Sequence, residues 1–497
     1  MQDWLSAQTQ ARPDAPALVI DGHAWSFRDL NDAVTTYAAA LDGLGVARGD
    51  NVALLMPNSF ATVCLIHAVM RVGAVLVPLN TRLTAPELDW QITHTHCKVV
   101  IYIDQAADEG PYTTANPEAL MQPGRQVIGV SALLGWAKDI TEKHRRGTVD
   151  LHAPFAIVFT SGTTGQPKGA VLTYDNFYQS AMASAYRLGV LPSDRWLCVL
   201  PLYHVGGLSI ILRSVLYGTT VDLYAKFEVE AINEALSTQP ITLVSLVPTM
   251  LYRLLDVKKQ WGVRLVLLGG AAASPELLER ARTAHVPVAI TYGLSEAASQ
   301  VATALPEEAL AKPGTVGRPL LFTSVRIIGE NGQPVPRGMV GEVVVSGPTV
   351  MQGYYEQPDA TAQTIKNGEL WTGDLGYLDA DGDLWLVQRR SDLIVSGGEN
   401  VYPAEVEAVL KKHPAVEDAC VVGVPHPEWG QQVAAAIVLR KGHTISDATL
   451  LAYSRERLAG YKQPRVIRFV EALPQTASGK ISRREVAALF AQLQPTR

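Results

Sequence analysis

One segment of the sequence combines the residue types that bind phosphate groups. Residues 160–169 read TSGTTGQPKG and follow an apolar stretch, residues 155–159, that predicts a strand. Glycine lets the backbone curl so that successive N–H groups point into one concavity, and such a concavity binds anions. The hydroxyl groups add further donors, and the lysine adds a positive charge. We expect a polyphosphate to be bound by Thr160, Ser161, Gly162, Thr163, Thr164, Gly165 and Lys168.

The spacing distinguishes this loop from a Walker A motif. That motif has the pattern GxxxxGK[ST], whereas here Pro167 precedes the lysine and Gly169 follows it. The alternative interpretation is a flexible polar loop without a ligand. Hydroxyls, glycines and a lysine lie together between the predicted strand and a predicted helix, residues 174–187, and this placement favours an anion site.

The elements that must position this loop alternate along the first 300 residues. Apolar strands, such as residues 51–56 and 287–292, alternate with amphipathic helices, such as residues 60–72. Alternation of this kind predicts parallel sheets covered by helices, with ligands at the carboxyl ends of the strands. The sequence therefore predicts an α/β fold whose large N-terminal lobe consists of parallel βα-layered subdomains.

The chain of 497 residues is too long for one hydrophobic core, because single cores stop growing near about 250–300 residues. We expect an N-terminal domain over residues 1–390. Its last part, residues 313–390, is predicted to be a small β-rich subdomain, since short strands alternate there with Gly, Pro and Asp turns. Residues 391–400 are polar and contain paired glycines, which predicts a hinge. Residues 401–497 predict a small, mobile α+β C-terminal lobe.

Composition and charge exclude several classes of function. The chain is 47% hydrophobic and 18% charged, and its net charge of −6 provides no basic field for nucleic acid. No secretory signal is visible at the start, and the longest apolar stretch, residues 61–79, is interrupted by His67 and Arg71, so no membrane span is expected. The four cysteines lie far apart and form no metal-binding pair. We expect a cytoplasmic protein.

Six motifs follow one another in order along the chain. They are SGTTGQPKG at 161–169, YGLSE at 292–296, TGD at 372–374, RRSD at 389–392, SGGEN at 396–400 and PQTASGK at 474–480. Together they resemble the motifs of the adenylate-forming, AMP-producing acyl-CoA synthetase superfamily, over essentially the whole chain. The resemblance implies an enzyme that uses Mg²⁺, ATP and CoA. Such an enzyme would join a carboxylic acid to AMP, release pyrophosphate, and then form the CoA thioester.

The resemblance also implies a role for each matching residue. Glu296 would hold the magnesium ion, and Asp374 and Arg389 would bind the ribose. Lys480 would reach the α-phosphate and the reacting carboxylate, and would share the catalytic role with Glu296 and Lys168. The other implied nucleotide-binding residues are Gly270, Ala271, Tyr292, Gly293 and Ser295. Without the resemblance, Glu296 could be an exposed loop residue and Asp374 part of an ordinary turn.

The resemblance further implies that the C-terminal lobe rotates between the two half-reactions. Ser391 would be the hinge residue, at a position where the superfamily commonly has Asp or Lys. The loop of Gly397, Gly398 and Glu399 would enter the site in the thioester-forming arrangement. No residue can be assigned to the nucleotide of CoA from the sequence.

These residue types suit the implied chemistry, because a carboxylate must attack the phosphate of an anionic nucleotide. Two like charges about 4 Å apart repel by roughly 4 kcal/mol at an effective dielectric constant of about 20. The site therefore needs cations and a metal at the phosphates, with donors for the departing pyrophosphate.

Amino-acid-activating members of the superfamily place an aspartate in the acyl pocket, where residues 201–208 of this chain, PLYHVGGL, contain His204 and no acid. The resemblance therefore favours a carboxylic acid without an α-amino group. Several stretches, including RRSDLIVSGGENVYPAEVE, are most similar to superfamily members that activate o-succinylbenzoate in menaquinone biosynthesis. That acid is a dicarboxylate whose second carboxylate must be held without reacting. Arg213 is a suitable partner for it, with His204 and Ser209 lining the acyl pocket. The alternative interpretation of Arg213 is a surface arginine whose charged end reaches the solvent. The alternative interpretation of His204 is a core histidine with satisfied hydrogen bonds.

Other functions stay open at this point. A fatty, malonyl or aryl acyl-CoA ligase would use the same machinery. A binding protein without catalysis and an oxidative, luciferase-like enzyme are alternatives of other classes. The expected partners are small molecules, without nucleic acid or a membrane span, and a homodimer is open.

Overall fold

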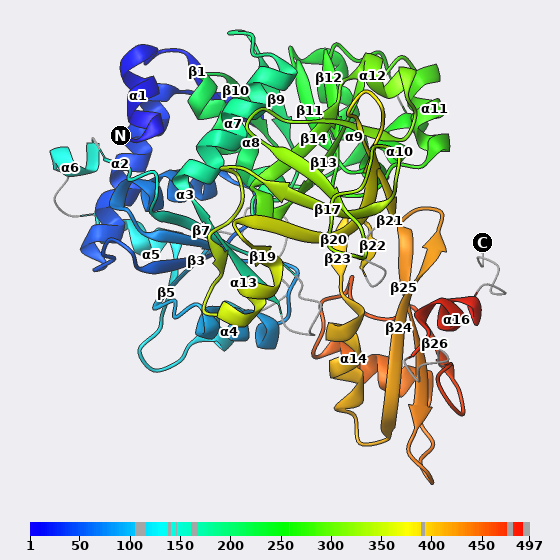
Figure 1. Ribbon diagram of the computed structural model, residues 1–497. Coiled ribbons are helices and arrows are strands. Elements are labelled where there is room, and N and C mark those ends of the chain that lie inside the picture. The colour runs from blue at the N-terminus through cyan, green and yellow to red at the C-terminus, as the bar shows by residue number, and fades with distance from the viewer. Residues whose placement is uncertain are drawn as a thin grey trace. The chain divides into compact units, whose positions relative to one another are not determined.

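The computed structural model describes the chain except residues 105–115, 138–140, 146, 161–166, 258, 389–392, 475–480 and 491–497. The chain divides into two compact units (Figure 1). The first comprises Met1–Thr81, Ile92–Val158 and Gly169–Gln388, and the second Arg82–Gln91, Phe159–Lys168 and Arg389–Arg497. Helices and strands mix in both, so the predicted α/β class is confirmed.

The largest sheet of the first unit has 14 strands. In spatial order they are β16 (Ser324–Ile328), β17 (Gly341–Ser346), β20 (Glu369–Leu378), β21 (Leu384–Gln388), β15 (Thr315–Pro319), β14 (Ser299–Ala304), β13 (Val288–Leu294), β12 (Leu265–Leu268), β11 (Leu243–Leu246), β9 (Arg195–Cys198), β10 (Thr220–Leu223), β1 (Pro16–Ile20) and β2 (His23–Ser26), with β19 (Ile365–Lys366) paired to β20. Strands β10, β9, β11, β12 and β13 pair in parallel. Every residue of β11 and β12 is buried, as expected for parallel strands covered on both faces.

Strands β15, β16, β17, β20 and β21 pair antiparallel. They begin near residue 313, where the sequence changes to short strands and turns, so the β-rich part is confirmed. It continues the large sheet through the pairing of β14 with β15.

A second sheet has seven strands. In spatial order they are β18 (Gly353–Tyr354), β8 (Lys168–Thr173), β7 (Pro154–Thr160), β4 (Val75–Pro78), β3 (Asn51–Leu55), β5 (Val99–Tyr102) and β6 (Gln126–Gly129). Strand β3 pairs in parallel with β4 and β5. The predicted phosphate loop connects two neighbouring strands of this sheet, β7 and β8.

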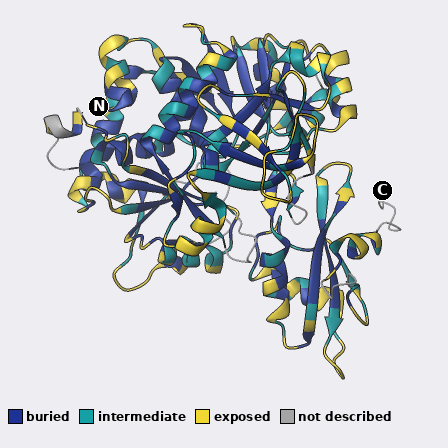
Figure 2. Ribbon diagram, in the orientation of Figure 1, coloured by how far each residue is buried: buried dark blue, intermediate teal, exposed yellow. Residues whose placement is uncertain are grey.

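Helices and 3₁₀ turns connect these strands along the chain, and Figure 2 shows their buried residues in dark blue. They are α1 (Trp4–Ala11), α2 (Phe27–Gly43), α3 (Phe60–Val72), α4 (Ala85–His94), η1 (Pro117–Leu120), α5 (Val130–Leu134), α6 (Glu142–Arg145), α7 (Tyr174–Leu188), α8 (Val205–Tyr217), α9 (Val229–Thr238), α10 (Pro248–Asp256), α11 (Pro275–Thr283), η2 (Ser295–Ala297), α12 (Pro306–Ala311) and α13 (Pro358–Thr364). Local signals set their ends. The Ser59 side chain caps α3, and Gly73 ends it with a φ of 76°.

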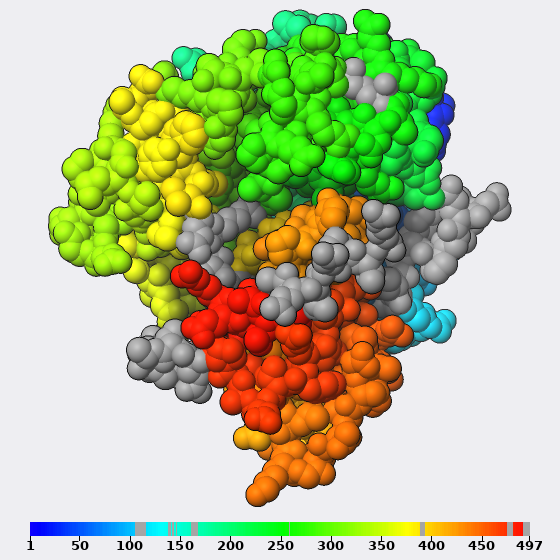
Figure 3. Space-filling model, turned by 90° about the vertical axis from the view of Figure 1, so that its right-hand side faces the viewer, coloured from blue at the N-terminus to red at the C-terminus, as the bar shows by residue number. Residues whose placement is uncertain are grey.

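The second unit contains a five-stranded sheet of β23 (Glu399–Val401), β22 (Ile394–Ser396), β25 (Gly430–Leu439), β24 (Val416–His426) and β26 (Val466–Phe469). Its helices are α14 (Pro403–Lys411), α15 (Asp447–Arg455) and α16 (Arg483–Ala488). The orange and red atoms of Figure 3 belong to this unit. Inside it, the buried Lys462 ammonium lies 2.7 Å from Glu405 and 2.8 Å from Glu87. Among the described residues, no helix is long and apolar enough to cross a bilayer.

Candidate active site

The described ends of the predicted phosphate loop are Thr160, the last residue of β7, and Lys168, the first residue of β8. The Thr160 hydroxyl donates a 3.4 Å hydrogen bond to the Lys168 carbonyl, which draws the two ends together. Lys168 is buried. Ser161, Gly162, Thr163, Thr164 and Gly165 lie outside the described residues.

The turn that contains Gly270 and Ala271, two of the implied nucleotide-binding residues, follows β12 at its carboxyl end. Gly270 has a φ of 79°, a conformation that glycine adopts without strain. A Cβ on Gly269 would lie 2.7 Å from Cγ2 of Thr291, so the turn packs directly against β13. Ala271 follows in the same turn. The turn therefore lies next to the strand that carries Tyr292, because β12 pairs with β13.

Tyr292 on β13 and Asp374 on β20 form a direct hydrogen bond. The tyrosine hydroxyl donates to Oδ2 of the carboxylate at 2.6 Å. Two hydrogen bonds from backbone N–H groups to side chains fix the turn before the aspartate. Gly373 N–H donates to the Glu342 carboxylate, and Asp374 N–H donates to the Thr372 hydroxyl. The structure thus brings together two predicted nucleotide-binding residues 82 positions apart, and the hydrogen bond orients the carboxylate.

Glu296 lies at the tip of a hairpin formed by β13, the 3₁₀ turn η2 and β14. The strand before it was predicted to end at residue 292, which is wrong, because β13 continues to Leu294 and pairs antiparallel with β14. Gly293 is required there, since a Cβ would lie 1.7 Å from the Ser299 carbonyl oxygen. Ser295 begins the 3₁₀ turn.

The Glu296 carboxylate has one described side-chain partner, the Tyr354 hydroxyl, which donates to Oε1 at 2.9 Å. Carboxylate oxygen is the ligand type that Mg²⁺ prefers, and Mg²⁺ bound beside phosphates uses one or two carboxylates. A half-exposed carboxylate that is already oriented fits that use.

Helix α8 carries the three predicted acyl-pocket residues at or after its start. His204 is its N-cap residue, with a half-buried ring beside Tyr203. Ser209 is buried, and its hydroxyl has no hydrogen-bond partner among the described residues. The prediction of an acyl pocket stays a prediction, whereas the structure excludes a surface position for Arg213, which is 2% exposed.

Arg213 is a buried cation bonded to neutral groups. Its guanidinium donates to the carbonyl of Ser209, the hydroxyl of Ser184 and, at 2.9 Å, Oε1 of Gln300. It also lies over the Trp196 ring, 5.4 Å from the centroid. Burial lowers the pKa of this guanidinium. Within the described residues no carboxylate pairs with the Arg213 guanidinium, and its described hydrogen-bond acceptors are all neutral.

The predicted thioester-stage loop is a two-residue turn between β22 and β23. Gly397 and Gly398 have φ values of 60° and 86°, the pattern of a type I′ hairpin turn. The buried Glu399 carboxylate accepts a 3.2 Å hydrogen bond from Arg82 of the same unit. Arg389, Ser391 and Lys480 lie outside the described residues, so their predicted roles are untested.

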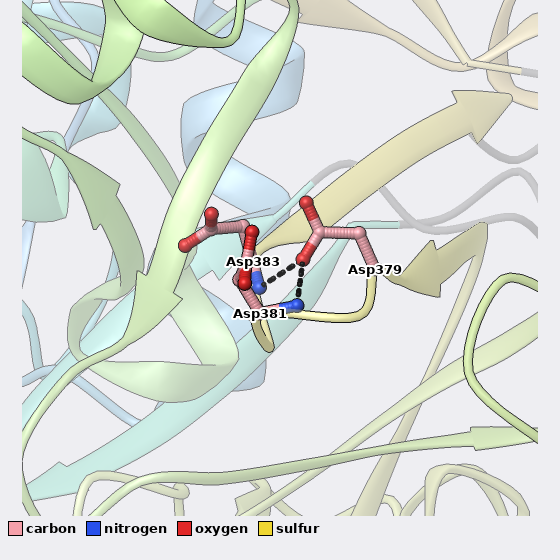
Figure 4. A group of neighbouring side chains, drawn as sticks. All are labelled: Asp379, Asp381 and Asp383. Carbon is pink, nitrogen blue, oxygen red and sulfur yellow. Dashed lines mark hydrogen bonds between the residues drawn. The ribbon is translucent and has the colours of Figure 1, made fainter.

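A cluster of three carboxylates in the first unit lies where a cation could bind, and the protein supplies that cation itself. Asp379 Oδ1 accepts hydrogen bonds from the backbone N–H groups of Asp381 and Asp383 (Figure 4). The Lys312 ammonium lies 2.8, 2.6 and 2.5 Å from these three carboxylates. Their hydrogen bonds raise the pKa of Lys312. In the structure this turn therefore forms an ion-pair network in which the Lys312 ammonium occupies the position of a cation.

Sequence reasoning missed two polar residues that the structure places at the candidate site. Tyr354, which contacts Glu296, occurs in the segment MQGYYEQ, whose composition suggests only a turn. Gln300, which contacts Arg213, lies four residues after the YGLSE motif. It belongs to β14, a strand that is recognised only from its pairing with β13 and not from its sequence. Gln300 could have been found from the sequence, because it lies close to the YGLSE motif. Tyr354 could not, because it lies 58 positions after Glu296.

Two family models match the chain. The model described as AMP-binding enzyme matches residues 5–355, and the model described as AMP-binding enzyme C-terminal domain matches residues 405–480. The chain is also 41% identical over 501 aligned residues to the 2-succinylbenzoate–CoA ligase of Geobacillus kaustophilus, covering 100% of this chain and 99% of that protein. It is 40% identical to the 2-succinylbenzoate–CoA ligase of Bacillus cereus strain Q1, covering 99% of each.

Among solved structures, the chain is similar to several of o-succinylbenzoate CoA synthetase. The chain is similar, at 36% identity and a TM-score of 0.93, to a double mutant of o-succinylbenzoate CoA synthetase from Bacillus subtilis bound to a product analogue, with 98% of each chain covered. The same bacterial enzyme in complex with its acyl-adenylate intermediate gives 37% identity and a TM-score of 0.75, again with 98% of each covered. Its complex with ATP and a magnesium ion gives 36% identity and a TM-score of 0.75, with 98% of this chain and 99% of that chain covered.

Proposed function

The chain belongs to the AMP-binding enzyme family, and on this basis we propose that it is an AMP-forming acid–CoA ligase whose acid is 2-succinylbenzoate. The 41% and 40% sequence identity to 2-succinylbenzoate–CoA ligases, which extends over 99% or more of this chain, supports the proposed reaction. The observation that carries the choice of acid is the buried Arg213 guanidinium, which no described carboxylate balances. A monocarboxylic acid would leave this charge unpaired during catalysis.

The reaction has two steps. First, an oxygen of the succinyl carboxylate attacks the α-phosphorus of ATP, and the bond from that phosphorus to the bridging oxygen breaks to release pyrophosphate. Second, the CoA sulfur, after losing its proton, attacks the acyl carbon of the mixed anhydride, and AMP leaves with the electron pair of the broken C–O bond. Both steps move negative charge onto phosphate oxygens, so both depend on fixed positive groups.

The nucleotide is held by residues from several loops in this proposal. The phosphate loop, residues 160–168, binds the phosphates, with Lys168 and Lys480 supplying positive charge. Asp374, oriented by Tyr292, accepts the ribose hydroxyls, and Arg389 lies beside the same ribose. The turn of Gly270 and Ala271 lies beside the adenine. Glu296 would hold Mg²⁺, which supplies positive charge to the phosphates when bound with ATP.

The acyl pocket distinguishes the two carboxylates of the substrate. The guanidinium of Arg213 would bind the benzoate carboxylate directly or through water. The buried hydroxyl of Ser209, which has no hydrogen-bond partner among the described residues, is a second donor one helical turn away. With the benzoate carboxylate held there, the succinyl carboxylate is the one left to reach the nucleotide. His204, at the start of α8, would line the entrance.

The division of labour between domains is part of the proposal. Residues 1–390 are the adenylation domain, residues 391–400 with Ser391 are the hinge, and residues 401–497 are the domain that rotates. Rotation brings Lys480 to the phosphates in the first step. In the second step it brings the turn of Gly397, Gly398 and Glu399 to the site. The four cysteines are free, which supports the cytoplasm as the compartment. A homodimer stays a prediction.

The proposal is tested with a panel of acids. Purified protein receives ATP, Mg²⁺ and CoA with 2-succinylbenzoate, benzoate, malonate or a fatty acid, and thioesters are identified by mass. We expect the 2-succinylbenzoyl thioester with at least tenfold preference over the others. Preference for another acid would leave the ligase chemistry intact and reject the substrate. No pyrophosphate release with any acid would reject the ligase.

A further inference from the structure

We propose that Tyr354 is a positioning residue for Glu296, and this inference rests on the ligase function proposed above. The side chain of Tyr354 is 8% exposed and packs in the main core of the first unit. Its hydroxyl donates to Oε1 of Glu296 at 2.9 Å. Glu296 accepts no other hydrogen bond from a described side chain. One carboxylate oxygen is thereby fixed, and Oε2 is left to bind a ligand.

The backbone of Glu296 is held by the same segment. Met351 N–H donates to the Glu296 carbonyl at 2.9 Å, so residues 351–354 contact both the main chain and the side chain of the glutamate. On the other side of the hairpin tip, the Ser180 hydroxyl donates to the Ala298 carbonyl at 2.7 Å. Ala298 and Ser299 have φ values of 48° and 97°. Such conformations persist in residues other than glycine only where the surroundings hold them.

The other end of this segment is bonded to the strand that leaves the phosphate loop. Strand β18 pairs antiparallel with β8, with Tyr354 opposite Ala170. Tyr355 N–H also donates to the Gly169 carbonyl at 2.8 Å. Gly169 immediately follows Lys168 in the chain. The segment 351–355 therefore connects Glu296 to the strand that begins where the phosphate loop ends.

This connection matters because Mg²⁺ demands near-ideal octahedral geometry and tolerates misplaced ligands poorly. A glutamate side chain at a turn would otherwise sample several rotamers, and each wrong rotamer reduces the time for which the site is competent. Groups that orient a metal ligand by hydrogen bonding typically change metal affinity about 10–100-fold. Tyr354 does this for Glu296 with its hydroxyl alone.

The test compares two neighbouring tyrosines. Tyr354→Phe removes the hydroxyl and keeps the buried ring, and Tyr355→Phe is the matched control, because its hydroxyl contacts Asn51 instead. Mn²⁺ affinity is measured by electron paramagnetic resonance in the presence of α,β-methylene-ATP. We expect Mn²⁺ to bind Tyr354→Phe about 10–100-fold more weakly, with Tyr355→Phe unchanged. Wild-type Mn²⁺ affinity in folded Tyr354→Phe would overturn the proposal.

A double variant and a second substitution complete the test. In the Glu296→Gln background, adding Tyr354→Phe should cause no further loss of Mn²⁺ affinity, and a full additional loss would contradict the role. If thermal unfolding shows that Tyr354→Phe is not folded, Tyr354→Met removes the same hydroxyl and is held to the same outcome. If the wild-type protein itself binds no Mn²⁺ with the analogue, the ligase function is wrong as well. If it does bind, failure concerns Tyr354 alone.

Discussion

The hydroxyl of Tyr292 donates a 2.6 Å hydrogen bond to Oδ2 of Asp374, joining the last parallel strand of the large sheet to a strand of its β-rich part. A carboxylate with one oxygen already bonded has a single orientation. In the proposed function this carboxylate accepts the ribose hydroxyls, and the hydrogen bond from Tyr292 reduces the number of side-chain rotamers that it samples. The bond also links β13 to β20, two strands that carry proposed nucleotide-binding residues.

We therefore predict that Tyr292→Phe weakens ATP binding. A hydrogen bond to a charged group contributes about 1.5–3 kcal/mol, and loss of the lower figure raises the KM for ATP about tenfold. The KM for the acid should stay unchanged. Pyrophosphate exchange measured at varied ATP checks this, with Tyr186→Phe as the control, because Tyr186 is exposed at the surface. An unchanged KM for ATP would show that the bond is structural only.

A second prediction concerns Arg213. Replacing it with Ala should lower kcat/KM for 2-succinylbenzoate by at least about 100-fold, the loss expected when a charge-assisted hydrogen bond of about 3 kcal/mol is removed. Pyrophosphate exchange with a monocarboxylic acid should fall far less, because that acid has no second carboxylate. Equal losses with both acids would remove Arg213 from the acyl pocket. Thermal unfolding of the variant establishes that the core around α8 survives.

Lys480→Ala should separate the two half-reactions. We expect adenylation to slow by at least about 10²–10³-fold, the effect of removing one preorganised donor at developing charge. Thioester formation from supplied acyl-adenylate should be largely retained, because that step occurs after the C-terminal lobe has rotated. Single-turnover measurements of each step provide the comparison. If both steps slowed equally, the two-arrangement mechanism would be wrong.

The pH dependence of stability is expected to reflect His67. Burial lowers the pKa of this imidazole from 6.5 to about 4, with Asp3 opposing and Arg71 reinforcing the shift. Neither ring nitrogen has a hydrogen-bond partner among the described residues. Since the folded pKa is depressed, the unfolded chain binds the proton first as the pH falls below 6.5. About 3 kcal/mol of stability is thus present above pH 6.5 and lost by pH 4.

The substitution His67→Phe removes the titratable imidazole and keeps an aromatic ring in the core. Urea unfolding between pH 4 and pH 8 should show a shallower loss of stability toward acid pH in the variant, with the curves diverging only below pH 6.5. Parallel curves for the two proteins would mean that His67 does not titrate on unfolding.

Elements with strong local signals were predictable from the sequence. Helix α3 spans Phe60–Val72, as predicted, because a serine cap precedes it and a left-handed glycine follows. Helix α7 was predicted to within one residue for the same reason, since Thr173 and Asn176 form a capping box. The parallel strands were predictable from their length and apolar composition.

Pairings between distant segments were not predictable. The extension of β13 to Leu294 depends on β14, which carries no period of its own and is defined by its neighbour. Tyr354 reaches a carboxylate 58 positions earlier, and no feature of its own segment indicates that partner. For Arg213 the sequence suggested the chemistry, but only the packing of α8 shows that the guanidinium is buried.

The ammonium of Lys312 among Asp379, Asp381 and Asp383 has a consequence for how the enzyme responds to its surroundings. A cation attached to the chain can be neither diluted away nor chelated, so the bend that ends β20 needs no calcium from the medium. The same strand carries Asp374. Chelators should then act on this enzyme through its nucleotide and leave the structure around Asp374, the proposed ribose-binding residue, unchanged.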